Sequence, residues 1–145
     1  MSIDGVTVRD LVEHVDQRGS VQKIVGAHSP EQPVFGEVYA SLTNPGVVKA
    51  WHLQAEQTNL LSCVAGRLRL VVHDARPDSP TRGRTLEVEL GDGARRLVRI
   101  PPGVVYGWKS VGEQTAILVN VSDRPHDPST SRKIDPASDE VPYAF

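Results

Sequence analysis

Short runs of aliphatic and β-branched residues, separated by Gly, Pro, Asn and Asp, recur along most of this 145-residue chain, whereas helix-length periodicity of 3.6 residues is scarce. The pattern predicts an all-β protein. Eight or nine strands in one small domain favour a jelly roll or barrel, since closing a sheet leaves few exposed edges. The expected strands cover residues 21–27, 34–43, 47–54, 58–66, 67–75, 85–91, 95–101, 103–111 and 115–123.

Alternation of apolar and polar residues assigns the two faces of these strands. In residues 115–123 it places Asn120 on the same face as Leu118, so that Asn120 faces either a polar cavity or solvent. Both faces of this strand are largely apolar, which predicts a central strand between a lumen and a second packing layer. In residues 67–75 we expect Leu68, Leu70 and Val72 to point inward and Arg67, Arg69 and His73 to point outward.

The C-terminal segment, residues 124–145, is rich in Pro, Asp and Ser and is unsuited to a central strand. We interpret it as a strap on a single domain that spans residues 1–145, docked through Val141, Tyr143 and Phe145. The alternative is a frayed tail.

Composition narrows the classes of partner. Sixteen Lys and Arg against 18 Asp and Glu give a formal charge of -2, so no global field favours nucleic acid or an anionic membrane. No apolar run approaches the roughly 20 residues of a membrane span, and we expect a cytoplasmic protein. The single cysteine, Cys63, excludes an internal disulfide framework and is expected to be a buried apolar residue.

The segment GVVKAWHLQAEQTN, residues 46–59, contains one histidine, His52, followed by Gln54. Metal-dependent cupin barrels combine several imidazole and carboxylate ligands, usually H-x-H with a downstream Glu and a further His. Here Tyr106 stands where that last histidine would fall. One imidazole with an amide and a phenol is a poor site for a divalent metal, and we expect neither a metal nor another cofactor.

His52 has two remaining interpretations. An imidazole with a pKa near 6.5 suits proton abstraction at neutral pH, provided that an acid stands across the substrate. His52 shares a strand face with Gln54, and Tyr106 is predicted at the same end of the barrel. The alternative is a core histidine that is hydrogen-bonded to the backbone.

The stretch DARPDSPTRGR, residues 74–84, resembles the D-x-R-x-x-S-P-T-x-G-R signature of the dTDP-4-dehydrorhamnose 3,5-epimerase family. Other matching segments occur in the same order over nearly the whole chain: HVDQRGSV, VVKAWHLQ, VAGRLRLVVHD, RIPPGVVYGW and SDRPHDP. The resemblance implies a metal-free cupin jelly roll, commonly a homodimer in which an N-terminal segment helps to build the partner's site. It also implies a dTDP-4-keto-6-deoxyhexose as substrate, with proton transfer at carbons next to the ketone.

The resemblance also assigns roles to single residues. The family's base matches His52, a nucleotide-sugar contact matches Arg18, and a basic residue that meets the diphosphate matches Lys49. Such an arrangement is chemically coherent, because a base beside a ketone needs only donors for the enolate and cations for the diphosphate.

Four family positions differ in this chain. The family's site lysine is Asn59, its proton-donating tyrosine is Asn120, its second histidine is Tyr106 and an acidic residue is Leu70. Asparagine donates a hydrogen bond to an enolate but returns no proton, so either Tyr106 or Tyr39 must supply the acid. We therefore expect catalysis by His52 and Tyr106, with substrate contacts from Arg18, Lys49, Gln54, Asn59, Asn120 and Tyr39.

Three functions are compatible with these residues. The leading hypothesis is an epimerase-like isomerase in deoxysugar or other specialised biosynthesis. The second is a metal-free cyclase or isomerase that acts on a different carbonyl-bearing molecule. The third is a small-molecule-binding protein without catalytic activity, which the replaced lysine and tyrosine favour.

Overall fold

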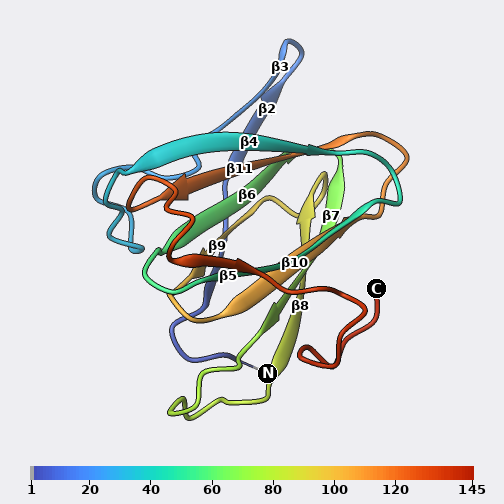
Figure 1. The fold of residues 1–145 in the computed structure, drawn as a ribbon. Helices are drawn as coiled ribbons and strands as arrows, with labels where there is room; N and C mark the ends of the chain where they lie inside the picture. The colour runs from blue at the N-terminus through green and yellow to red at the C-terminus, as the bar shows by residue number, and fades with distance from the viewer. Residues whose placement is uncertain (1) are drawn as a thin grey trace.

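The computed structural model describes residues 2–145 as two five-stranded antiparallel sheets and one separate hairpin (Figure 1). One sheet has the order β1-β9-β6-β11-β4, the other β12-β5-β10-β7-β8, and the hairpin pairs β2 with β3. The strands are β1 Thr7–Asp10, β2 Glu13–Asp16, β3 Gly19–Gln22, β4 Glu37–Thr43, β5 Val48–Gln54, β6 Asn59–Ala65, β7 Arg67–His73, β8 Thr85–Gly91, β9 Arg96–Ile100, β10 Val105–Ser110, β11 Ala116–Ser122 and β12 Ser131–Lys133. None of the described residues belongs to a helix long and apolar enough to cross a membrane.

The all-β prediction is confirmed, and each expected strand from residue 34 to residue 123 corresponds to one of β4–β11. The expected strand at residues 21–27 is wrong over most of its length, because β3 ends at Gln22. Three short strands were not expected: β1, β2 and β12. Their side chains are mostly exposed, so no alternation of apolar and polar residues marks them.

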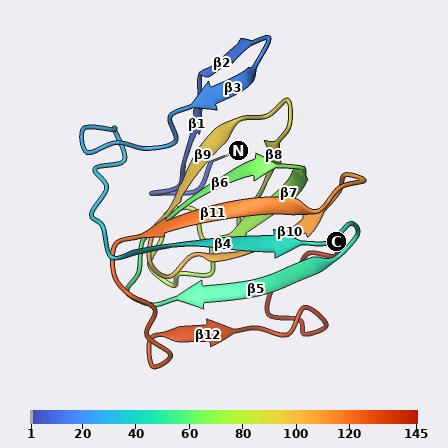
Figure 2. The same ribbon diagram turned by 90° about the horizontal axis from the view of Figure 1, so that it is seen from above.

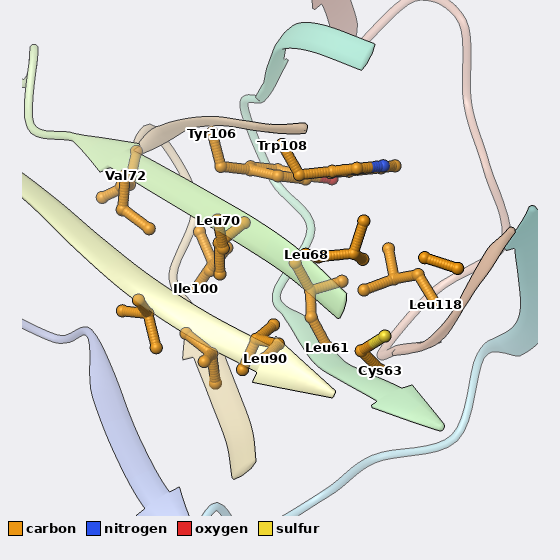
Figure 3. Packing of buried hydrophobic residues seen from close by; sticks show 14 of the residues in the cluster. Leu61, Cys63, Leu68, Leu70, Val72, Leu90, Ile100, Tyr106, Trp108 and Leu118 are labelled. Carbon is orange, nitrogen blue, oxygen red and sulfur yellow. The ribbon is translucent and has the colours of Figure 1, made fainter. Parts of the chain in front are cut away.

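The main core lies between the two large sheets. The inward set of β7, Leu68, Leu70 and Val72, is fully buried there, and Leu118 reaches the same core from β11 (Figure 3). This confirms the assignment of inward residues in both strands. β11 lies between β6 and β4, which confirms that it is a central strand.

The outer face of β7 differs from expectation in one residue. His73 alternates with the inward Val72 and so lies on the outer face, as expected, but it is buried there, with 5% of its surface exposed. Its Nδ1 lies 2.9 Å from the Oγ1 of Thr85 on β8, the neighbouring strand. Strand pairing therefore supplies a polar partner for His73, and the local sequence pattern does not show this.

A second, smaller core forms on the outer side of β5. Trp51 is 1% exposed there and packs with Ile134 and Val141 of the C-terminal segment. The rings of Tyr143 and Phe145 lie 6.1 and 5.1 Å from that of Trp51. β12 also pairs with β5, at the edge of the sheet (Figure 2). The C-terminal segment thus covers the outer face of the strand that carries His52.

The loop after β7 is held by one buried carboxylate. Asp74 is fully buried, and its oxygens accept hydrogen bonds from Arg76, Ser79 and Thr81 at 2.5 to 2.9 Å. Burial by itself raises the pKa of the Asp74 carboxyl, but these hydrogen bonds outweigh it and hold the pKa well below its usual range. The residues of the family-like signature thus stabilise a loop.

Candidate functional site

A cavity of about 420 Å³ opens between β4 of one sheet and β5 and β10 of the other, within the usual size of small-molecule sites. The C-terminal segment completes its wall. The residues that carry its chemistry are Tyr39, His52, Gln54, Tyr106, Ser131 and Lys133.

Alternation along β5 aims His52 toward this cavity. Its neighbour Trp51 is buried in the outer core, so His52 faces inward. The imidazole stacks on Trp108, with ring centroids 5.1 Å apart and an interplanar angle of 27°. The indole of Trp108 is itself held, because its Nε1 donates a hydrogen bond of 3.0 Å to Thr43. The ring of His52 therefore has a packed orientation.

The electrostatics of His52 favour a neutral ring. Burial lowers the pKa of His52 to about 4, and the positive charges of Lys133 and Lys49 act in the same direction. A hydrogen bond to the backbone of Lys49 opposes this shift. Within residues 2–145, the Nε2 of His52 is buried without a hydrogen-bond partner. At neutral pH this nitrogen is able to accept a proton.

Tyr106 lies beside His52 in the same sheet. The two residues are direct cross-strand partners, and their ring centroids lie 5.3 Å apart. Tyr106 also stands next to Trp108, with the two rings in nearly parallel planes (Figure 3). Burial raises the pKa of the Tyr106 phenol, so it stays protonated at neutral pH. Tyr106 thus approaches a ligand from the same sheet as the base.

The facing sheet contributes a network of buried amides. Asn120 donates to Asn59 at 3.1 Å and to the Tyr39 hydroxyl at 2.9 Å, and Gln57 donates to Asn59 at 2.7 Å. Asn59 and Asn120 are almost completely buried. Among the described residues, the Nδ2 of Asn59 and the Oδ1 of Asn120 have no partner. The network therefore retains one free donor and one free acceptor.

Tyr39 is the phenol of this facing sheet. Its hydroxyl oxygen accepts the hydrogen bond from Asn120, which leaves its own proton available for a ligand. Burial raises the pKa of Tyr39, so that proton is retained at neutral pH. Tyr39 lies on β4 and His52 on β5, and these strands belong to opposite sheets.

Four predicted contacts lie outside the cavity wall: Asn59 and Asn120, which belong to the buried amide network beside it, and the two cations Arg18 and Lys49. Arg18 belongs to the turn of the β2–β3 hairpin, which projects from the sandwich (Figure 2), and its guanidinium pairs with Asp16 at 2.6 Å. Lys49 extends from β5 to β4, where its Nζ donates to Ser41 and to the carbonyl of Leu42. Within one chain, neither cation lines the cavity.

The C-terminal segment supplies cavity residues that sequence reasoning missed. His126, Ser131 and Lys133 line the wall, and the Ser131 hydroxyl donates to Gln54 at 2.5 Å. Gly36 allows the chain to cross here, because a Cβ at that position would lie 2.1 Å from the backbone of Arg124. One sequence signal could have indicated these residues. The segment was expected to dock on the barrel through its last apolar residues, so its polar side chains could be expected to lie close to the barrel.

Comparison with known proteins gives a consistent result. A family model described as dTDP-4-dehydrorhamnose 3,5-epimerase matches residues 1–144. The probable low-salt glycan biosynthesis epimerase Agl13 of Haloferax volcanii is 33% identical, over 98% of this chain and 89% of that protein. The crystal structure of a dTDP sugar isomerase from Desulfovibrio desulfuricans has a TM-score of 0.94 at 33% identity, over 98% of this chain and 91% of that one. The crystal structure of NovW of Streptomyces spheroides, a 4-keto-6-deoxy sugar epimerase, has a TM-score of 0.89 at 26% identity, over 100% of this chain and 76% of that one.

Proposed function

The chain belongs to the dTDP-4-dehydrorhamnose 3,5-epimerase family, and from this premise we propose that it is an isomerase that epimerises a dTDP-4-keto-6-deoxy sugar by moving a proton at a carbon next to the ketone. The observation that carries the proposal is the neutral, stacked His52, whose unpartnered Nε2 belongs to a residue of the cavity wall. A buried lone pair of this kind is suited to accept a proton from carbon.

In the proposed reaction, the Nε2 of His52 takes the proton from the carbon beside the ketone. The electrons of that C–H bond form a carbon–carbon double bond, and the carbonyl electron pair moves to oxygen to give an enolate. A proton returned to the opposite face of the carbon regenerates the ketone with inverted configuration. The balance is that of an isomerisation, because solvent exchange restores both the base and the acid.

We assign the returned proton to Tyr39, with Tyr106 as a contact to the substrate. The position of Tyr39 on the sheet that faces His52 supports this choice, whereas Tyr106 lies in the same sheet as the base. The hydrogen bond from Asn120 also supports it, since it leaves the Tyr39 proton free.

We also propose a homodimer in which Arg18 reaches the cavity of the partner subunit. Large apolar side chains exposed on the hairpin and on β4 support it, among them Val15 and Val21 at 70% and Leu42 at 57%. Surfaces of this kind commonly mark protein interfaces. Light scattering should return twice the mass of one chain, and a monomer at working concentration would contradict the proposal.

The proposed isomerase activity is tested by measuring solvent deuterium uptake into dTDP-4-keto-6-deoxyglucose, catalysed by the wild type and by His52→Asn. We expect the rate to fall about 10²- to 10⁴-fold in the variant, which is the usual contribution of one general base. His28→Asn, in an exposed loop outside the cavity wall, is the matched control and should exchange like the wild type.

Three outcomes separate the alternatives. Uptake that survives His52→Asn in a folded protein would refute the role of the base. Tight binding of the nucleotide sugar by the wild type without uptake over hours would indicate a binding protein. If the protein binds no thymidine diphosphate compound but binds a different carbonyl-bearing molecule, the result would favour the second hypothesis, a metal-free cyclase or isomerase with another substrate.

A further inference from the structure

Lys133 lies directly across from the proposed base. In the antiparallel pair of β12 and β5, Lys133 is the register partner of His52, and Ser131 is the partner of Gln54. Directly opposed residues share a face of the sheet, with their Cβ atoms about 5 Å apart. The hydrogen bond between the side chains of Ser131 and Gln54 shows that this face is the cavity side. Lys133 therefore extends along the cavity wall beside the imidazole.

The other cations nearby are already engaged. Arg132 pairs with Glu140 at 2.9 Å, and the Nζ of Lys49 is bound to β4. Over the described part of the chain, Lys133 forms no ion pair within 4 Å. The lowering of the His52 pKa by the charge of Lys133 agrees with a short distance between the two groups. The ammonium is thus available to a ligand.

The proposed chemistry needs such a charge. An enolate oxygen carries a negative charge next to the carbon that the base deprotonates, and a cation placed there stabilises it. The family's lysine position is occupied by Asn59, whose amide donates a hydrogen bond but has no net charge. In the empty site, a cation close to His52 disfavours protonation of the imidazole. When an enolate forms between the two groups, its negative charge offsets this repulsion. The attraction between the cation and the enolate therefore arises only as the reaction proceeds.

We propose that Lys133 is a catalytic residue whose ammonium donates a hydrogen bond to the enolate oxygen and so replaces the absent lysine at position 59. This inference rests on the proposed function. As the C–H electron pair moves into the ring and the carbonyl pair moves to oxygen, Lys133 keeps its proton and balances the new charge. A strand from the C-terminal segment would then complete the site that β5 begins.

The experiment compares Lys133→Met and Lys133→Arg with Lys109→Met, a control on β10 outside the cavity wall. Deuterium uptake should fall about 10²- to 10³-fold in Lys133→Met, the usual cost of losing one donor to a developing oxyanion. Lys133→Arg should recover part of the rate. The dissociation constant for dTDP, measured by calorimetry, should stay unchanged, and the His52 pKa, measured by NMR, should rise in Lys133→Met.

The outcomes separate this inference from the function on which it rests. Weaker dTDP binding with an intact rate would make Lys133 a diphosphate ligand and would overturn the catalytic role. If the wild type exchanges deuterium and Lys133→Met exchanges it at the same rate, the catalytic role of Lys133 is overturned and the proposed function stands. A wild type that exchanges no deuterium would overturn the proposed function and this role together. Thermal melts of each variant verify that it is folded, and Lys133→Arg keeps the test decisive if Lys133→Met is not.

Discussion

The Asp74 loop and the His52 cavity both bury polar groups, but they differ in how these groups are satisfied. Both oxygens of Asp74 accept hydrogen bonds from within the loop. In the cavity and the amide network beside it, His52, Asn59 and Asn120 each retain a buried polar atom without a partner in the described structure. An unpaired buried group costs free energy, and at the edge of a cavity a bound ligand can supply the missing partner.

The comparison also shows that the segment with the most specific match to the family is not the segment that contains the proposed base. Residues 74–84 carry the most specific family signature in the sequence, yet their side chains bond mainly to one another and to the backbone of Ser2 and Asp4. The weaker match around His52 contains the residue with the free lone pair. A recognisable motif therefore identified the family, whereas the proposed site is supported by the cavity and by the His52 nitrogen without a partner.

The largest stability effect is expected at the loop. Asp74→Ala should lower the free energy of unfolding by about 3 to 5 kcal/mol, because it leaves Arg76 partly buried without its partner. Urea denaturation measures this, with Asp78→Ala in an exposed part of the same loop as the control. The control should change stability by less than about 0.5 kcal/mol. Equal effects in the two variants would remove the distinction between the loop and an ordinary surface turn.

A smaller effect is expected from the titration of His52. Its pKa is about 4 in the folded protein against 6.5 in the unfolded chain, so the unfolded state binds the proton more readily. The stability from the neutral ring is fully present above pH 6.5 and is lost as the pH falls toward 4. The wild type should lose up to about 3 kcal/mol over this window relative to His52→Asn.

Unfolding curves of both proteins at several pH values between 7 and 4 measure that difference. The carboxylates that titrate in the same window are common to both proteins and cancel. A constant difference would mean that the His52 ring takes up a proton as readily as in the unfolded chain, and burial would then not hold it neutral.

The sequence alone determined the strands β4–β11, the inward set of β7 and the position of His52 beside Gln54 and Tyr106. These features follow from alternation, which reflects local burial and is therefore legible in neighbouring residues. Motif order added the family.

The tertiary structure alone decided which residues meet across the fold. It separated Tyr39 from Tyr106 onto opposite sheets, left Arg18 on a projecting hairpin, buried His73 against Thr85 and brought Lys133 opposite His52. An edge strand such as β12 pairs through backbone N–H and C=O groups, which every residue except proline has. Its register therefore cannot be predicted from the pattern of its side chains. Lys133 and His52 are 81 positions apart, and only the closure of the whole sandwich makes them neighbours.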